Sequence, residues 1–215
     1  MSMPMQPVIV SYVTDSLGPD ELNTLIQLIK SIYLHFYPSS SEERIRLRIT
    51  RKKTTVVDVL LMDNHVCAFG VYYSQMVQNH KVLFRDGTMV DQAMQSKSYY
   101  KLLVKHSIDM SAPDYMVTRT QNPRVYESLK SFSPSGLIYP DVDFHVPEEI
   151  SSVASFFHEN GEFDRKTLVV KGVYTNGQGR ADADFWSVRD QKTVQLFRNF
   201  LTEFDAFMLV IPTGH

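Results

Sequence analysis

The stretch from Lys81 to Asp109 constrains the fold more than any other part of the chain. Its first part, Lys81–Val90, is rich in apolar residues and bounded by polar ones, which is typical of a β-strand. The polar segment Asp91–Ser98 follows, and from about Tyr99 apolar residues recur at helical spacing. The sequence therefore predicts a strand, a loop and a helix in direct succession. The first N–H groups of such a helix have no partner inside it and are suited to bind a phosphate.

The composition is that of a packed domain of ordinary charge. The chain has 215 residues, 43% of them hydrophobic, and a net charge of -2, so no basic excess favours a nucleic-acid partner. Cys67 is the only cysteine and lies in an apolar run, which predicts a core position. No apolar run is long enough to span a membrane, and the first residues lack the pattern of a secretory signal. We therefore expect a soluble, cytoplasmic protein.

Several kinds of site have no motif in this sequence. The seven histidines show no HExxH or paired ligand spacing, so no metal site is predicted. A GxSxG nucleophile elbow and a Walker loop are also absent from the sequence.

Hydrophobic periodicity and turn residues place the other elements. Asp20 is the expected cap of the first helix, and Asn122 with Pro123 is expected to begin a later one. In chain order we predict a strand at 8–13, a helix at 21–37, a hairpin at 54–62 and 66–77, the central strand and helix, a strand at 114–120, a helix from 122, a helix at 148–159, a strand at 166–174, a loop at 175–184, a helix at 193–204 and a strand at 207–212.

A basic run at 44–53 has two interpretations. It is either a solvated face or a lip that attracts a phosphorylated ligand or an acidic partner.

From residue 8 to about 140 this order of elements resembles the GNAT acetyltransferase family. The resemblance implies a mixed α/β (α+β) fold with a mostly antiparallel central sheet flanked by helices. It places a GNAT-like, acyl-CoA-binding core at 1–140 and a C-terminal α/β extension, packed on that core, at 141–215.

The loop before the central helix carries a partial match to the family motif, in which Arg or Gln is followed by two residues, Gly, one residue, and Gly or Ala. Gln95 falls on the first position, Ser98 on the first Gly and Tyr100 on the second. Glycines let phosphate oxygens approach the backbone closely, and Lys97 can offset part of their absence as a point charge. The resemblance implies these cofactor-binding residues: Met89, Val90, Gln95, Ser96, Lys97, Ser98, Tyr99 and Asn122.

A second matching segment carries the catalytic residues that the resemblance implies. Tyr126, in the helix led by Asn122, matches the family tyrosine that often protonates the departing CoA thiolate; its alternative role is packing. Asp86, Asp91 and His106 are candidates for the base, and no spacing separates them. We name Asp91 with Tyr126 as the catalytic pair.

Two functions follow from this resemblance. The first is an N-acyltransferase, in which an amine attacks the thioester of acetyl-CoA or another acyl-CoA directly. The expected partners are the acyl-CoA, an amine acceptor that is a small molecule or a protein, and a second copy of the chain if it forms a homodimer. The alternative is a GNAT-like binding or interaction module without catalysis; a subunit of a larger assembly is a third class.

Overall fold

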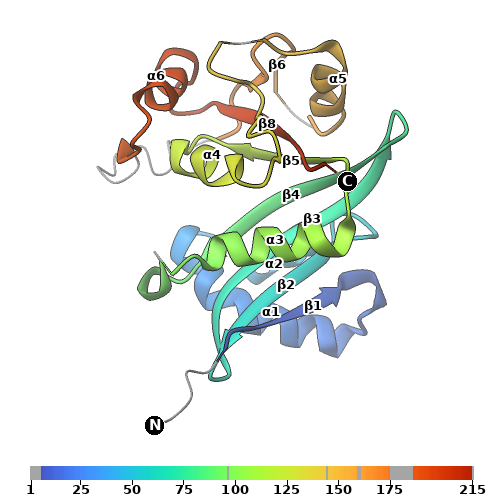
Figure 1. Ribbon diagram of the computed structural model, residues 1–215. Helices are drawn as coiled ribbons and strands as arrows, with labels where there is room; N and C mark the ends of the chain where they lie inside the picture. The colour runs from blue at the N-terminus through green and yellow to red at the C-terminus, as the bar shows by residue number, and fades with distance from the viewer. Residues whose placement is uncertain (1–5, 96, 144, 159–160, 175–185, 215) are drawn as a thin grey trace. The chain divides into compact units, whose positions relative to one another are not determined.

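The computed structural model describes residues 6–95, 97–143, 145–158, 161–174 and 186–214 (Figure 1). The chain divides into two compact units. The first comprises Met1–Ser74 and Arg85–Ser111, and the second comprises Gln75–Phe84 and Ala112–His215. The predicted loop at 175–184 and the predicted site residue Ser96 lie outside the described residues.

The described residues of the first unit form four neighbouring strands and three α-helices. Its elements are β1 (Val8–Val13), α1 (Pro19–Phe36), α2 (Glu42–Ile49), β2 (Val56–Met62), the first part of β3 (His65–Val77), the last part of β4 (His80–Val90) and α3 (Tyr99–Ser111). β1 pairs with β2 and β2 with β3, both antiparallel. Asp63 and Asn64, both at positive φ, form the tight turn between β2 and β3, so the predicted hairpin is confirmed.

The two faces of these strands pack against different helices. Val57, Val59 and Phe69 pack with the buried faces of α1 and α2, whereas Leu60 and Ala68 pack with Tyr99 and Leu103 of α3. Because alternate residues of a strand point to opposite faces, α1 and α2 cover one face and α3 the other (Figure 1). Cys67 is fully buried, as predicted.

The start of α1 differs from the prediction. Gly18 is the N-cap and Pro19 the first helical residue, and the Gly18 N–H donates to the Glu21 carboxylate at 2.8 Å. Asp20 is therefore already inside the helix. Proline fits the first helical position because that residue needs no N–H partner there.

The second unit is built around β8 (Ala206–Pro212). β8 pairs antiparallel with β5 (Tyr115–Thr120) on one side and with β7 (Val169–Val170) on the other, and β7 pairs with β6 (Phe163–Asp164). The helices of this unit are α4 (Pro123–Lys130), α5 (Glu148–Phe156) and α6 (Gln191–Phe200). Tyr126, Phe197 and Phe207 form a chain of edge-to-face aromatic contacts in its core.

The strand predicted at 166–174 is wrong over most of its length. Only Val169 and Val170 are strand residues. The Asp164 carboxylate accepts hydrogen bonds from the Lys166 N–H and the Thr167 hydroxyl, which closes a turn just before them. Gly172, at φ 67°, turns the chain again just after them.

The predicted fold class, a mixed α/β fold with a mostly antiparallel sheet flanked by helices, is confirmed by these elements and pairings. The predicted boundary at residue 140 stays a prediction. The segment after it supplies β6, β7 and β8, which join β5 within the second unit. Among the described residues, no helix combines the length and the apolar character that crossing a bilayer requires.

Candidate functional site

The loop after β4 begins with a carboxylate that is fixed by the backbone. The Asp91 N–H donates to the Cys67 carbonyl at 2.9 Å, which anchors Asp91 to β3. Its side-chain Oδ1 accepts from the Ala93 N–H, also at 2.9 Å, and so caps a short 3-10 turn at Gln92–Met94. These two bonds hold the Asp91 carboxylate at the end of the strand.

The polar side chains that the motif placed in the loop lie at the surface. Gln95 is exposed, and its N–H lies 3.4 Å from the Gln92 carbonyl. Lys97 is exposed, and its Nζ lies 3.4 Å from Met94 Sδ. An exposed ammonium group near a helix start is placed to attract an anion from solution.

Ser98 has the backbone conformation of a glycine. Its φ is 62°, and its carbonyl accepts from the Leu102 N–H at 3.1 Å, which starts the hydrogen bonding of α3. A residue with a Cβ in this left-handed region costs about 1–2 kcal/mol relative to the right-handed one. The motif position where glycine is usual is therefore one that requires a glycine-like φ here.

Tyr99 and Tyr100 at the start of α3 both have part of their side chain inside the protein. Tyr99 is buried and its hydroxyl lies 3.5 Å from Met62 Sδ. Burial raises the pKa of Tyr100 to about 12, and the neighbouring Arg85 guanidinium acts in the opposite direction. The Tyr100 hydroxyl is thus close enough to Arg85 for the two groups to interact electrostatically.

A buried arginine ties α3 to the sheet. Arg85 is 2% exposed; its guanidinium donates to the hydroxyls of Ser107 and Thr88 and lies 3.5 Å from the Leu103 carbonyl. Burial lowers the pKa of Arg85, although nearby Tyr100 and Asp58 favour its charged form. Gly70 makes room for it, since a Cβ there would lie 3.2 Å from the Arg85 Nη2.

Asp58 is the buried carboxylate near this arginine, and its strand pairs it directly with Gly70. Its Oδ1 accepts from the Ser11 hydroxyl at 2.6 Å and the Tyr72 hydroxyl at 3.3 Å, and His106 Nε2 lies 3.8 Å away. Burial raises the pKa of Asp58, while the Ser11 hydrogen bond and the charges of His106 and Arg85 oppose this shift. His106, a candidate base on α3, therefore belongs to a polar cluster with Ser11 and Asp58.

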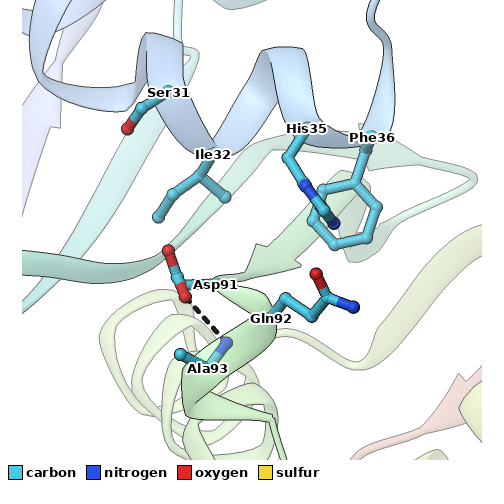
Figure 2. A pocket seen from close by; sticks show the side chains of 7 residues that line it. All are labelled: Ser31, Ile32, His35, Phe36, Asp91, Gln92 and Ala93. Atoms are coloured by element: carbon cyan, nitrogen blue, oxygen red, sulfur yellow. Dashed lines mark hydrogen bonds between the residues drawn. The ribbon is translucent and has the colours of Figure 1, made fainter.

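An open hollow of about 460 Å³ lies where α1 meets the end of β4. Figure 2 shows the C-terminal half of α1 on one side and the turn after β4 on the other. The residues that line it are Ser31, Ile32, His35, Phe36, Asp91, Gln92 and Ala93. Of the predicted site residues, Asp91 is the one found in this hollow.

The side chains of Met89 and Val90 are used for packing on opposite faces of the sheet. Met89 is buried in the cluster with α1 and α2, and Val90 packs beside the cluster that includes Tyr99. Only their backbone groups remain for the binding role that the resemblance implies.

Asp86 is engaged by an arginine from the basic run. Its Oδ2 lies 3.2 Å from Arg48 Nε, and its carbonyl accepts from Arg48 Nη2. The Arg48 guanidinium also lies 5.8 Å from the ring centroids of Tyr33 and Tyr37. Arg48 is therefore an anchor between α2 and β4, a role that neither interpretation of the basic run contained.

Tyr126 and Asn122 lie in the second unit, Tyr126 on α4 and Asn122 at its N-cap. Tyr126 is 1% exposed, its hydroxyl donates to the Pro140 carbonyl at 3.0 Å, and burial raises its pKa. The Asn122 side chain accepts from the Arg124 N–H at 2.9 Å, which confirms the predicted cap.

Replacing Asn122 by Ala is expected to lower the free energy of unfolding by about 1 kcal/mol, because the cap of α4 is lost. Urea denaturation followed by circular dichroism measures this change. Asn122→Asp keeps a side-chain acceptor and should be close to wild type. An equal loss of unfolding free energy in Asn122→Ala and Asn122→Asp would contradict the capping role.

The described residues contain no group of three or more His, Cys, Asp or Glu side chains arranged to hold a metal ion.

No protein-family model matches the chain, and no match is found among curated proteins. Solved structures give matches. A GNAT family acetyltransferase from Staphylococcus aureus is 18% identical with a TM-score of 0.40, over 50% of this chain and 79% of that chain. An IAA acetyltransferase from Bacillus cereus is 17% identical with a TM-score of 0.43, over 60% and 76%. A chain of the NatC complex, solved with Gag peptide and CoA, is 15% identical with a TM-score of 0.45, over 95% and 98%.

The described elements begin in the order that the resemblance predicted: strand, helix, three strands, helix, strand and helix, with α2 as an addition before the second strand. The strand that the resemblance predicted next is wrong, because the element that follows α4 is the helix α5. The loop that carries the partial motif lies between β4 and α3.

Proposed function

We propose that this protein is an acyl-CoA-dependent N-acyltransferase, and that the start of α3 holds the cofactor diphosphate. The observation that carries the proposal is the conformation of Ser98, whose φ of 62° lies in the left-handed region that glycine adopts most readily. A strand that leads through such a loop into a helix aims amide N–H groups at one point. Exposed Gln95 and Lys97 add donors and a positive charge beside that point.

The reaction that this proposal implies is direct acyl transfer. The amine nitrogen forms a bond to the thioester carbonyl carbon, and the carbon–sulfur bond breaks. The ammonium proton of the acceptor goes to a base, for which we propose Asp91. The departing thiolate takes a proton from an acid, for which we propose Tyr126, and the second proton that the nitrogen loses on becoming an amide restores the proton of that acid.

Backbone groups of β4 supply the electrostatic part of the mechanism. We propose that the N–H of Met89 or Val90 donates to the thioester carbonyl oxygen, where negative charge develops. Holding amine and thioester at attack distance contributes a further large share of the rate. The resemblance also places Asn122 near the cofactor. We propose that it acts by capping α4, the helix that carries Tyr126.

Calorimetric titration with CoA and acetyl-CoA tests the proposal, and Ser98 offers a matched pair of variants. Ser98→Gly relieves the left-handed strain and opens the loop, so we expect CoA to bind several-fold more tightly and the unfolding free energy to rise by about 1 kcal/mol. Ser98→Asp tolerates the same φ but places a negative charge beside the diphosphate, so we expect a loss of affinity of about tenfold or more.

The absence of heat from wild type and Ser98→Gly at millimolar CoA would end the case for a thioester-using enzyme. Equal CoA affinity in Ser98→Gly and Ser98→Asp would place the diphosphate away from this loop.

The second candidate is a GNAT-like binding module without catalysis. The observation that favours it is the side chain of Tyr126, which is buried and already donates to the Pro140 carbonyl. CoA binding without turnover for any amine tested would select this candidate.

A further inference from the structure

The hollow between α1 and the end of β4 combines one charge with an apolar wall. Among the described residues that line the hollow, Asp91 is the only one with a formal charge at neutral pH when His35 is neutral. Phe36, which is 38% exposed, supplies the accessible apolar surface, whereas Ile32 is only 2% exposed. A hollow with this lining fits a cationic group attached to an apolar body.

The Asp91 carboxylate is held in place before any ligand arrives. Its Oδ1 accepts from the Ala93 N–H at 2.9 Å, which fixes the side chain against the turn. Figure 2 shows the other carboxylate oxygen on the side of α1, facing Ile32. A carboxylate fixed in this way binds an ammonium group at a lower entropic cost than a mobile one.

The apolar wall is also ordered. The ring of Phe36 meets the His35 ring edge to face, with centroids 5.4 Å apart, and Ile32 is nearly fully buried beneath. An aliphatic or aromatic body packed here removes apolar surface from water. Ser31 and Gln92 at the rim present polar groups without formal charge.

From this lining we infer that the hollow is the acceptor site and that the acceptor is a protonated primary amine on an apolar body. The ammonium group pairs with Asp91, and the body lies against the exposed ring of Phe36. This inference rests on the proposed N-acyltransferase function and names the substrate class for it. Before attack, one ammonium proton passes to the Asp91 carboxylate and frees the nitrogen lone pair for the thioester carbon.

The test is titration of the full-length protein, saturated with desulfo-CoA, with hexylamine and with hexanoate. We expect hexylamine to bind and hexanoate, which has the opposite charge, to give no signal. Asp91→Asn removes the charge yet keeps an oxygen that accepts from Ala93, so the turn should persist. We expect hexylamine affinity to fall about tenfold or more, because a hydrogen bond to a charged group is lost.

Asp63→Asn is the matched control. Asp63 is an exposed residue in the β2–β3 turn at φ 53°, a conformation that Asn also adopts, and it lies outside the hollow. This variant removes the same charge elsewhere and should keep wild-type amine affinity.

Three results would overturn the inference. CoA binding without any amine binding would reject the amine class while leaving the acyl-CoA function in place. Weaker CoA binding in Asp91→Asn, with amine affinity unchanged, would assign the hollow to the cofactor. An equal loss of hexylamine affinity in Asp63→Asn would mean that the effect comes from the net charge of the protein and not from the hollow. Failure of CoA itself to bind would instead refute the proposed function, and hexylamine titration of the free protein would then still test the hollow.

Discussion

Replacing Arg85 by Met is expected to lower the free energy of unfolding by about 3–5 kcal/mol, the largest effect on stability that we predict for a polar side chain here. Arg85 is buried and links β4 to α3 through Ser107 and the Leu103 carbonyl. Its removal leaves the buried Asp58 carboxylate without its nearby guanidinium charge. Asp58 keeps the hydrogen bonds from Ser11 and Tyr72 and the nearby His106, but it loses one of the positive charges that oppose the cost of its burial.

Urea denaturation measures the global effect, and hydrogen exchange of the α3 amides shows whether α3 loosens first. Asp58→Asn is the matched partner because an amide oxygen can still accept from the Ser11 and Tyr72 hydroxyls. The double variant removes both charges and should be more stable than Arg85→Met alone. Additive losses in the double variant would mean that the two charges do not interact.

Local patterns predicted most of the first unit. The apolar run of β4, the polar loop and the helical spacing from Tyr99 correspond to a strand, a loop and α3 in the structure. The Asp63–Asn64 hairpin turn and the Asn122 cap were also readable, since each depends on residues adjacent in sequence. These features need only backbone preferences and short-range hydrogen bonds.

The strand predicted at 166–174 was wrong because of a short-range hydrogen-bonding pattern. Its apolar pattern favoured an extended backbone. The Asp164 carboxylate instead accepts hydrogen bonds from the Lys166 N–H and the Thr167 hydroxyl, which forms a turn. Side-chain acceptors just before an apolar run compete with the strand, and periodicity does not weigh that competition.

The polar anchors of the site were missed because their partners are far apart in the chain. Arg48 and Asp86 are 38 residues apart, and Ser11 and Asp58 are 47 apart. One signal was available: Asp58 interrupts the apolar run of β2, and Arg85 interrupts that of β4. A charge within a run that is otherwise buried predicts a partner, although the sequence does not name it.

Tyr126→Phe is expected to reduce kcat by about 100-fold or more while CoA affinity stays unchanged, since a general acid contributes at this level. Burial raises the pKa of Tyr126, so the proposed acid stays protonated through the neutral and mildly alkaline range. Steady-state kinetics with an apolar primary amine measures kcat, and calorimetry measures CoA affinity. The free energy of unfolding of the variant should also be lower by about 1–3 kcal/mol, because the buried Pro140 carbonyl loses its hydrogen-bond donor.

Tyr115→Phe separates the acid from a general effect of losing a tyrosine hydroxyl. Tyr115 lies on β5 in the same unit, and its hydroxyl donates to the Glu149 carboxylate at 2.7 Å. It has no proposed part in the reaction, so kcat should not change. If Tyr126→Phe loses stability but keeps full kcat, the hydroxyl serves packing alone. The thiolate would then take its proton from another donor, because acyl transfer releases a thiolate whichever residue protonates it.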